Sequence, residues 1–164
     1  MSIEDCIGTS DMPYWLRVAR LVLQLAELGH RGRSSLLKMD GLRQRGRIYT
    51  VLIDGDPDSA PAFREDSAQL CETLERALNA VPLPVGLYSA NTPDPGAIAG
   101  PLARLDAFAR TGAVVSVRVD HARAPKLLQV HVGFGEAYFH VEGSELRPLL
   151  KRAITFAEAL RTSP

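Results

Sequence analysis

The sequence predicts an α+β fold, with a mainly antiparallel sheet of about five strands and helices packed on it. The expected elements follow the order αββα(β)αβββα, and runs of strands between helices are typical of this class. The chain has 164 residues, which suits one domain; we expect residues 10–164 to form it after a flexible N-terminal tail at 1–9. Hydrophobic residues make up 46% and charged residues 23%, so the composition favours a packed core over disorder.

The first helix is expected from Ser10 or Asp11 to Leu28, because these polar residues can cap it and Gly29 can end it. Its polar residues recur at spacings of three and four, so they share one narrow stripe and the rest of the circumference is apolar. Such a helix must be buried, either inside the fold or against another chain. We therefore predict an interaction surface made by Trp15, Leu21, Leu23 and Leu28.

Two strands and a second helix are expected next. Residues 34–40 and 47–54 predict strands on either side of a basic loop. The second strand is β-branched, aromatic and apolar on both faces, which favours a central position in the sheet. A Gly/Pro/Asp loop at 55–62 leads to a helix over 66–79, which two following prolines end.

The remaining elements are a short strand, a loop, a helix, three strands and a final helix. Residues 85–88 predict the short strand, and 89–100 form a loop rich in proline and glycine. A helix opens at Pro101, and Ser144 caps the final helix, which has a clean apolar stripe. The three strands between these helices are expected over 113–120, 126–132 and 137–142. No internal repeat is evident.

Charge is balanced overall but segregated along the chain. Nineteen basic and nineteen acidic residues give a net charge of zero, which argues against a surface that follows nucleic acid throughout. Residues 17–47 carry a net six positive charges, and residues 54–75 carry a net six negative charges. The simpler interpretation is that the two segments neutralise each other in the fold. The alternative is a basic patch and an acidic patch that each face a partner.

Arginine residues cluster in two loops of the basic segment. Arginine forks suit phosphate or carboxylate groups, so a nucleic-acid-associated protein is one hypothesis. However, Arg33 and Arg47 begin opposite ends of the expected strand pair, so the two loops do not obviously meet. Solvated loop charge is the simpler interpretation. The candidate basic patch consists of Arg31, Arg33, Arg43, Arg45 and Arg47.

An acidic loop follows the second strand. Its carboxylates fall at positions 1, 3, 5 and 12 of a twelve-residue frame, the spacing with which calcium loops direct oxygens at one cation. Position 6 should be glycine for the sharp turn and is Ser59, and no helix precedes the loop. A polar strand-to-helix turn is the simpler interpretation. We therefore predict no metal, with one weak candidate site: Asp54, Asp56, Asp58 and Glu65.

The C-terminal hairpin has a polar face. If Gly135 and Glu136 form a two-residue turn, for which glycine suits the first position, His131 lies directly opposite His140. Two opposed histidines can hold a metal or titrate together near neutral pH, although the wet side of an antiparallel sheet is the simpler interpretation. We keep this face as a candidate ligand or partner site, made by Arg118, Gln129, His131, Tyr138 and His140.

Catalytic and targeting motifs are absent from the sequence. It has no Gly-x-Ser-x-Gly, His-Glu-x-x-His, phosphate-binding glycine loop or Cys-x-x-Cys. Two cysteines, Cys6 and Cys71, make no disulfide framework and fit a reducing compartment. The start of the chain is acidic, and no apolar stretch approaches the roughly 18 residues of a membrane span. We expect a cytoplasmic protein that needs no cofactor and does not contact a membrane.

The part of the chain from residue 101 to 161, a helix, strands and a long final helix, loosely resembles the layout of small secretion chaperones. Those chaperones are typically acidic, whereas this chain is neutral, and the expected helix at 66–79 departs from their order. The resemblance therefore concerns layout alone, and no motif or residue role is carried over.

These observations favour a non-catalytic protein-binding module, such as a small cytosolic adaptor, chaperone or toxin-neutralising protein, and we expect a dimer. Its partner is expected to be a second copy or another cytosolic protein, because the first helix needs cover. The alternative is a small enzyme or ligand-binding protein that uses the polar hairpin face. The second alternative is the nucleic-acid-associated protein.

Overall fold

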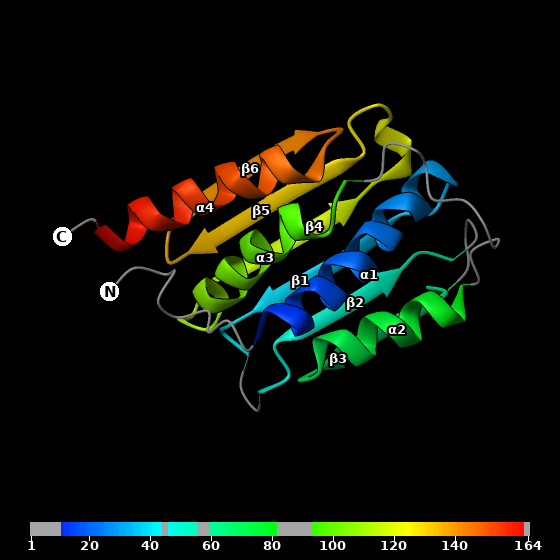
Figure 1. The fold of residues 1–164 in the computed structure, drawn as a ribbon, viewed down its shortest axis with the longest axis horizontal. Helices are drawn as coiled ribbons and strands as arrows, with labels where there is room; N and C mark the ends of the chain where they lie inside the picture. The colour runs from blue at the N-terminus through cyan, green and yellow to red at the C-terminus, as the bar shows by residue number, and fades with distance from the viewer. Residues whose placement is uncertain (1–10, 44–45, 56–59, 82–92, 163–164) are drawn as a thin grey trace.

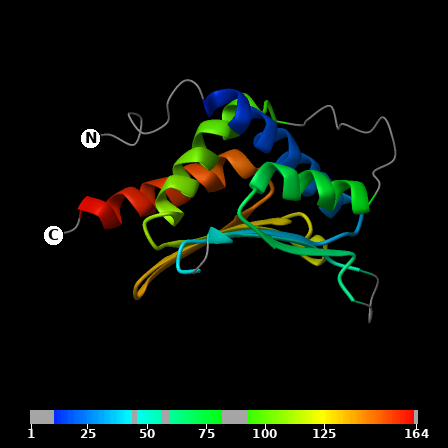
Figure 2. The same ribbon diagram turned by 90° about the horizontal axis from the view of Figure 1, so that it is seen from below.

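A computed structural model describes residues 11–43, 46–55, 60–81 and 93–162. Within these ranges the fold is α+β, as the sequence predicts, with four α-helices on an antiparallel sheet. The sheet has six strands rather than about five, in the order β3-β2-β1-β4-β5-β6 (Figure 1). Figure 2 shows that all four helices lie on one face of the sheet and leave the other face uncovered. The fold therefore has two layers and one open sheet face.

The four helices and six strands of the described residues have the following bounds. The helices are α1 (Met12–His30), α2 (Leu70–Ala80), α3 (Gly96–Ala109) and α4 (Leu146–Thr162), and η4 (His121–Arg123) is a short 3-10 helix. The strands are β1 (Ser35–Asp40), β2 (Tyr49–Ile53), β3 (Phe63–Ser67), β4 (Val114–Val119), β5 (Leu128–Phe134) and β6 (Ala137–Gly143). The third helix begins at Gly96, five residues before the expected start, and Pro101 lies inside it. The short strand expected at 85–88 lies outside the described residues.

Helix α1 is buried by the chain itself. It packs between α2 and α3 and lies over β1 and β4 (Figure 1). Trp15 is 7% exposed, Leu23 6% and Leu28 2%, while Leu21 is partly buried. The apolar circumference predicted from the sequence is therefore explained by a helix with neighbours on both sides and a sheet beneath it. No second chain is needed to cover these side chains.

Strand β3 is the strand that the sequence did not reveal. Its residues, Phe-Arg-Glu-Asp-Ser, are charged and alternate weakly, so they fitted a loop followed by a helix start. In the sheet they occupy an edge, where charged side chains are tolerated because one side of the strand faces solvent. Asp66 accepts hydrogen bonds from Thr50 and Arg43, and Glu65 accepts from Arg76. The following helix consequently starts at Leu70 rather than at 66.

The order of elements repeats once along the described chain. The set α1, β1, β2, β3, α2 is followed by α3, β4, β5, β6, α4. The two halves meet through the antiparallel pair β1 and β4 at the centre of the sheet, and α1 meets α3 above it. The sequence showed no repeat, because the two halves share an arrangement of elements without an evident residue pattern.

Candidate functional site

The open face of the sheet gathers the polar hairpin residues predicted from the sequence. Strand alternation and register put Arg118, Gln129, His131, Tyr138 and His140 on this face. His131 lies opposite His140, and Gly135 has the positive φ of +58° that the first turn position requires. The local turn and the alternation were sufficient to predict this arrangement.

His131 is the most constrained of these side chains. Its Nδ1 lies 2.6 Å from the Tyr138 hydroxyl, and its ring stacks on His140 with centroids 4.5 Å apart. Burial lowers the pKa of His131 below its ordinary value, and the neighbouring His140 and Arg118 lower it further. The environment of His131 therefore favours its neutral form, with the ring held between the Tyr138 hydroxyl and the His140 imidazole.

A shallow depression of about 480 Å³ lies on the same face. Its polar lining includes Ser116, Arg118, His131 and Tyr138, whereas Gln129 lies buried beside it at 4% exposure. Its apolar lining, which the sequence analysis missed, is Leu36, Leu52 and Val114. These side chains come from β1, β2 and β4. Because those strands are apolar at both alternating positions, the sequence pattern does not show which face of the sheet each residue occupies.

Ionic charge on this face is largely compensated. Lys38 pairs with Asp40 at 2.7 Å, and Arg118 lies 3.6 Å from Asp120. Glu142 pairs with Arg123 at 3.0 Å and with Lys126 at 3.7 Å. The open face therefore presents hydrogen-bonding groups around an apolar centre rather than a surface of one sign.

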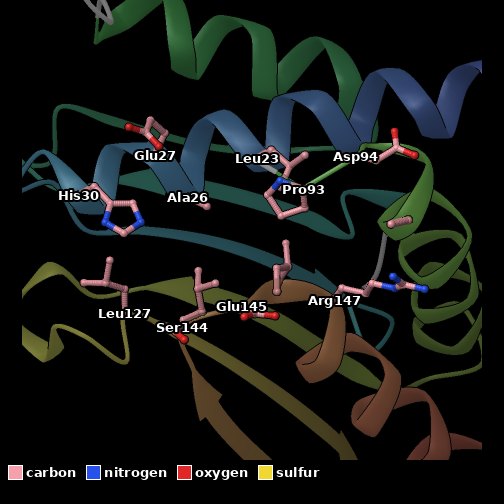
Figure 3. A pocket seen from close by; sticks show the side chains of 13 residues that line it. Leu23, Ala26, Glu27, His30, Pro93, Asp94, Leu127, Ser144, Glu145 and Arg147 are labelled. Carbon is pink, nitrogen blue, oxygen red and sulfur yellow. The ribbon is translucent and has the colours of Figure 1, made fainter. Parts of the chain in front are cut away.

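A second cavity, about 660 Å³ in volume, lies in the helix layer. It is lined by α1, the start of α3, the start of β5 and the link from β6 into α4, and we call it the helix-layer groove. In Figure 3, Leu23, Ala26 and His30 on α1 face Leu127, Ser144 and Glu145 across this groove. Leu128, Leu146 and Ala97 add to its apolar lining. A volume of this size falls within the range of ligand-binding cavities.

Carboxylates border the groove from three sides. Glu27 lies on α1, Asp94 lies before α3, and Glu145 lies before α4. Asp94 accepts a hydrogen bond from the Gly96 amide at 3.1 Å, which orders the first turn of α3. Arg147 and His30 are the basic groups of the lining, so its acidic groups outnumber its basic ones. The arrangement can hold an apolar group and place a cation beside it.

No local sequence pattern predicts this groove, because its walls come from four places far apart in the chain. Leu23 was predicted to belong to an interaction surface, but only because it lies on a helix that is apolar over most of its circumference. Nothing in the local pattern around Ser144 or Asp94 indicates that these two links face α1. Only the packing of α3 between α1 and α4 opens the space.

The arginine loops lie at opposite ends of the β1–β2 pair. Arg33 is next to the start of β1 and donates to the Asp54 carbonyl, whereas Arg43 follows the end of β1 and pairs with Asp66 at 2.6 Å. Arg31 lies 3.8 Å from Glu27, Arg47 is exposed, and Arg45 lies outside the described residues. Arg17 also pairs with Glu75. The basic and acidic segments thus neutralise each other in part, and the arginines do not form one patch.

The acidic loop does not assemble a cation site from the residues that the structure describes. Glu65 lies in β3 opposite Val51, and its carboxylate is bonded to Arg76 and Thr73. Asp54 is exposed beyond the end of β2, three residues after Val51, the residue that pairs with Glu65. Asp56 and Asp58 lie outside the described ranges. Across those ranges, no group of three or more histidine, cysteine, aspartate or glutamate side chains could hold a metal ion.

Comparison with known proteins finds no relative: no family model, no curated protein and no solved structure matches this chain. Among the helices of the described ranges, none has the length and apolar character needed to cross a membrane.

Proposed function

We propose that this protein is a non-catalytic binding protein that holds an apolar segment of a partner protein in the helix-layer groove. One observation carries the proposal: the helix layer leaves an apolar cavity of about 660 Å³ open above the start of β5. Leu23, Leu127 and Leu128 line the cavity but are each only 5–6% exposed. The apolar surface that a partner would cover is therefore mainly that of the partly exposed Ala26, Pro93 and Ala97.

The chemistry of the lining supports binding rather than a reaction. The groove brings together leucine and alanine side chains with carboxylates at its border, and Asp94 is engaged with its own helix start. No described serine or cysteine lies within hydrogen-bond reach of a base in this groove, which is the arrangement that a nucleophile needs. The buried Cys71 has its thiol pKa raised by burial, which also disfavours a reactive thiolate.

The charge of the border specifies the segment further. Asp94 and Glu145 border the apolar lining, whereas Glu27 already lies 3.8 Å from Arg31 and Arg147 is a basic group of the same lining. The acidic groups still outnumber the basic ones, so the best-fitting segment carries a lysine or arginine next to leucine-like side chains. An acidic segment would meet like charges at the border and bind less well. A partner of this composition is the occupant to which the proposal commits.

The test measures peptide binding by fluorescence anisotropy. The probe is a labelled synthetic peptide of leucine and lysine, with a leucine and glutamate peptide of equal length as its counterpart. Ala26→Phe fills the groove from α1 and is expected to weaken binding of the lysine peptide by about tenfold. Ala80→Phe, an exposed site on α2, is the matched control and should change little.

A charge reversal provides the second arm of this test. Glu145→Lys at the groove should weaken the lysine peptide and improve the glutamate peptide, whereas Glu136→Lys in the hairpin turn should affect neither. If Ala26→Phe and Ala80→Phe bind the lysine peptide equally well, the groove is not its binding site and the proposal is wrong.

A second candidate function is the binding of a small polar ligand in the open-face depression. The lowered pKa of His131 and its bond to Tyr138 favour it, because perturbed titration together with a cavity is typical of ligand sites. The test records the imidazole resonances of His131 and His140 while acetate or phosphate is added. Unchanged resonances at millimolar concentrations of both anions would dismiss this candidate for anionic ligands.

A further inference from the structure

Strand β6 is an edge strand of seven residues whose outer side has no partner strand among the described residues. In a hairpin with a two-residue turn, the pair flanking the turn exchanges hydrogen bonds, and bonded pairs then alternate along the ladder. Phe134 and Ala137 flank this turn, so Ala137, Phe139 and Val141 bond inward to β5. The backbone groups of Tyr138, His140 and Glu142 point outward, away from the sheet.

The two edges of this sheet differ in how they are protected. Charged side chains, short length and proline normally keep an edge strand from pairing with another chain. Strand β3 at the other edge has five residues, three of them charged. Strand β6 has no lysine, arginine or proline, and its single charge, Glu142, is neutralised by Arg123 and Lys126. The β6 edge thus lacks every one of these devices.

Apolar side chains border the β6 edge on both faces. On the helix side, Phe139 stacks on Phe156 of α4 with centroids 5.0 Å apart, and both rings are only partly buried. On the open face, Tyr138 is 65% exposed, although its ring is large and apolar. Tyr138 leans inward, because its hydroxyl lies 2.6 Å from His131 Nδ1 of β5. A strand added at this edge would cover the outer side of Phe139 and pair the outward backbone groups at the same time.

We propose that two copies of this chain associate through β6, antiparallel and related by a two-fold axis, so that one sheet runs through both. A two-fold interface is self-complementary, and an antiparallel pair of identical strands meets that condition directly. The largely uncharged side chains of β6 make the pair compatible with itself. With the two-fold axis at His140, the middle of the strand, Glu142 of one copy faces Tyr138 of the other, so no acidic side chain faces another.

This inference goes beyond the groove function and uses a different surface, because no residue of β6 lines the helix-layer groove. The dimer would leave both grooves accessible. The two proposals can therefore fail separately.

The test is sedimentation equilibrium over about 1–100 µM protein, a range that covers moderate self-association. The natural chain is expected to be a dimer at the upper concentrations. His140→Pro removes one outward amide without removing an inward bond to β5, and it should give a monomer with an unchanged far-ultraviolet spectrum.

His140→Lys keeps every backbone group and adds a charge at the β6 edge. It therefore tests association through β6 even if the proline variant does not fold. It should raise the dimer dissociation constant by at least about tenfold. Leu42→Lys, at a side chain 70% exposed beyond the end of β1, is the matched control and should leave the dimer intact.

Hydrogen exchange locates the interface independently. The amide of His140 should exchange slowly at high protein concentration and quickly at low concentration, whereas the inward amide of Val141 should be protected at both. A natural chain that is monomeric throughout the range, or a dimer that both His140 variants leave unchanged, would overturn the proposal.

Discussion

A buried polar cluster joins β2 to α3, and its removal is the sharpest test of how this fold is held together. Asp106 is 5% exposed and accepts hydrogen bonds from the Tyr49 hydroxyl at 2.6 Å and from Arg110 Nε at 2.8 Å. Arg110 Nη2 also donates to the Tyr49 hydroxyl at 2.6 Å. We predict that Asp106→Ala destabilises the protein more than any exposed carboxylate-to-alanine change.

The expected loss of stability in Asp106→Ala follows from the interactions that Tyr49 and Arg110 lose. A hydrogen bond to a charged group contributes about 1.5–3 kcal/mol, and a buried hydroxyl left without its acceptor costs about 1–3 kcal/mol. The Arg110 side chain is 58% exposed, so its ion pair with Asp106 adds at most about 1 kcal/mol after solvent screening. Because these contributions overlap, we expect Asp106→Ala to lower the free energy of unfolding by about 2–4 kcal/mol.

The assay is urea unfolding, with Glu136→Ala in the exposed hairpin turn as the control. Tyr49→Phe leaves the bond between Arg110 and Asp106 in place, so it should cost less than Asp106→Ala, about 1–1.5 kcal/mol. A loss below about 0.5 kcal/mol for Asp106→Ala, with an unchanged dependence on urea, would refute this reasoning. A changed urea dependence would instead indicate that the compactness of the unfolded or native state had changed, or that unfolding was no longer two-state.

Tyr49 also links this cluster to pH. Burial and the charge of Asp106 raise the pKa of Tyr49 above its ordinary value of 10. The Tyr49 hydroxyl loses its proton more readily in the unfolded chain than in the folded one. Its contribution to the free energy of unfolding is therefore complete below about pH 10 and decreases as the pH rises further. In urea unfolding at alkaline pH, the difference in stability between the natural chain and Tyr49→Phe should shrink. A constant difference would contradict this assignment.

Three further outcomes follow from the packing. The pKa of His131 is lowered in the folded state, so His131 contributes to the free energy of unfolding above about pH 6.5, and this contribution is lost as the pH falls further. In urea unfolding, His131→Gln should therefore reduce the decline in stability at acidic pH. Gly41→Ala would put a Cβ 1.7 Å from the Ala109 carbonyl oxygen, and melting should show a loss of about 3 kcal/mol, whereas Gly133→Ala meets no atom and should be tolerated. Leu74→Ala in α2, fully buried, should cost about 2–5 kcal/mol by the same measurement.

Local patterns were enough to predict much of the fold. The class, both long helices and the register of the last hairpin came from periodicity and from a two-residue turn at Gly135 and Glu136. These features depend on residues close together in the chain. Strand β3 was missed for the opposite reason: its charged residues become a strand only because β2 offers a free side to pair with.

The candidate site divides in the same way. Alternation along β4, β5 and β6 predicted which polar side chains share the open face, but not the apolar centre that Leu36 and Leu52 contribute. Helix α1 was expected to be buried, and it is; the sequence could not tell whether α2 and α3 or a second chain would cover Trp15 and Leu28. The helix-layer groove had no signal in the sequence at all.

Amino-acid order alone therefore predicts most of the helices and strands, though not β3, and which of their sides avoid water, because both follow from neighbours within a few positions. The tertiary structure settles what lies against each apolar side, which edge of the sheet is unprotected, and where the helix layer leaves a gap. Those properties arise from segments more than a hundred residues apart, such as those of Leu23 and Leu127, whose contact no local sequence pattern predicts. The unprotected β6 edge and the groove are both of this second kind, and both functional proposals rest on them.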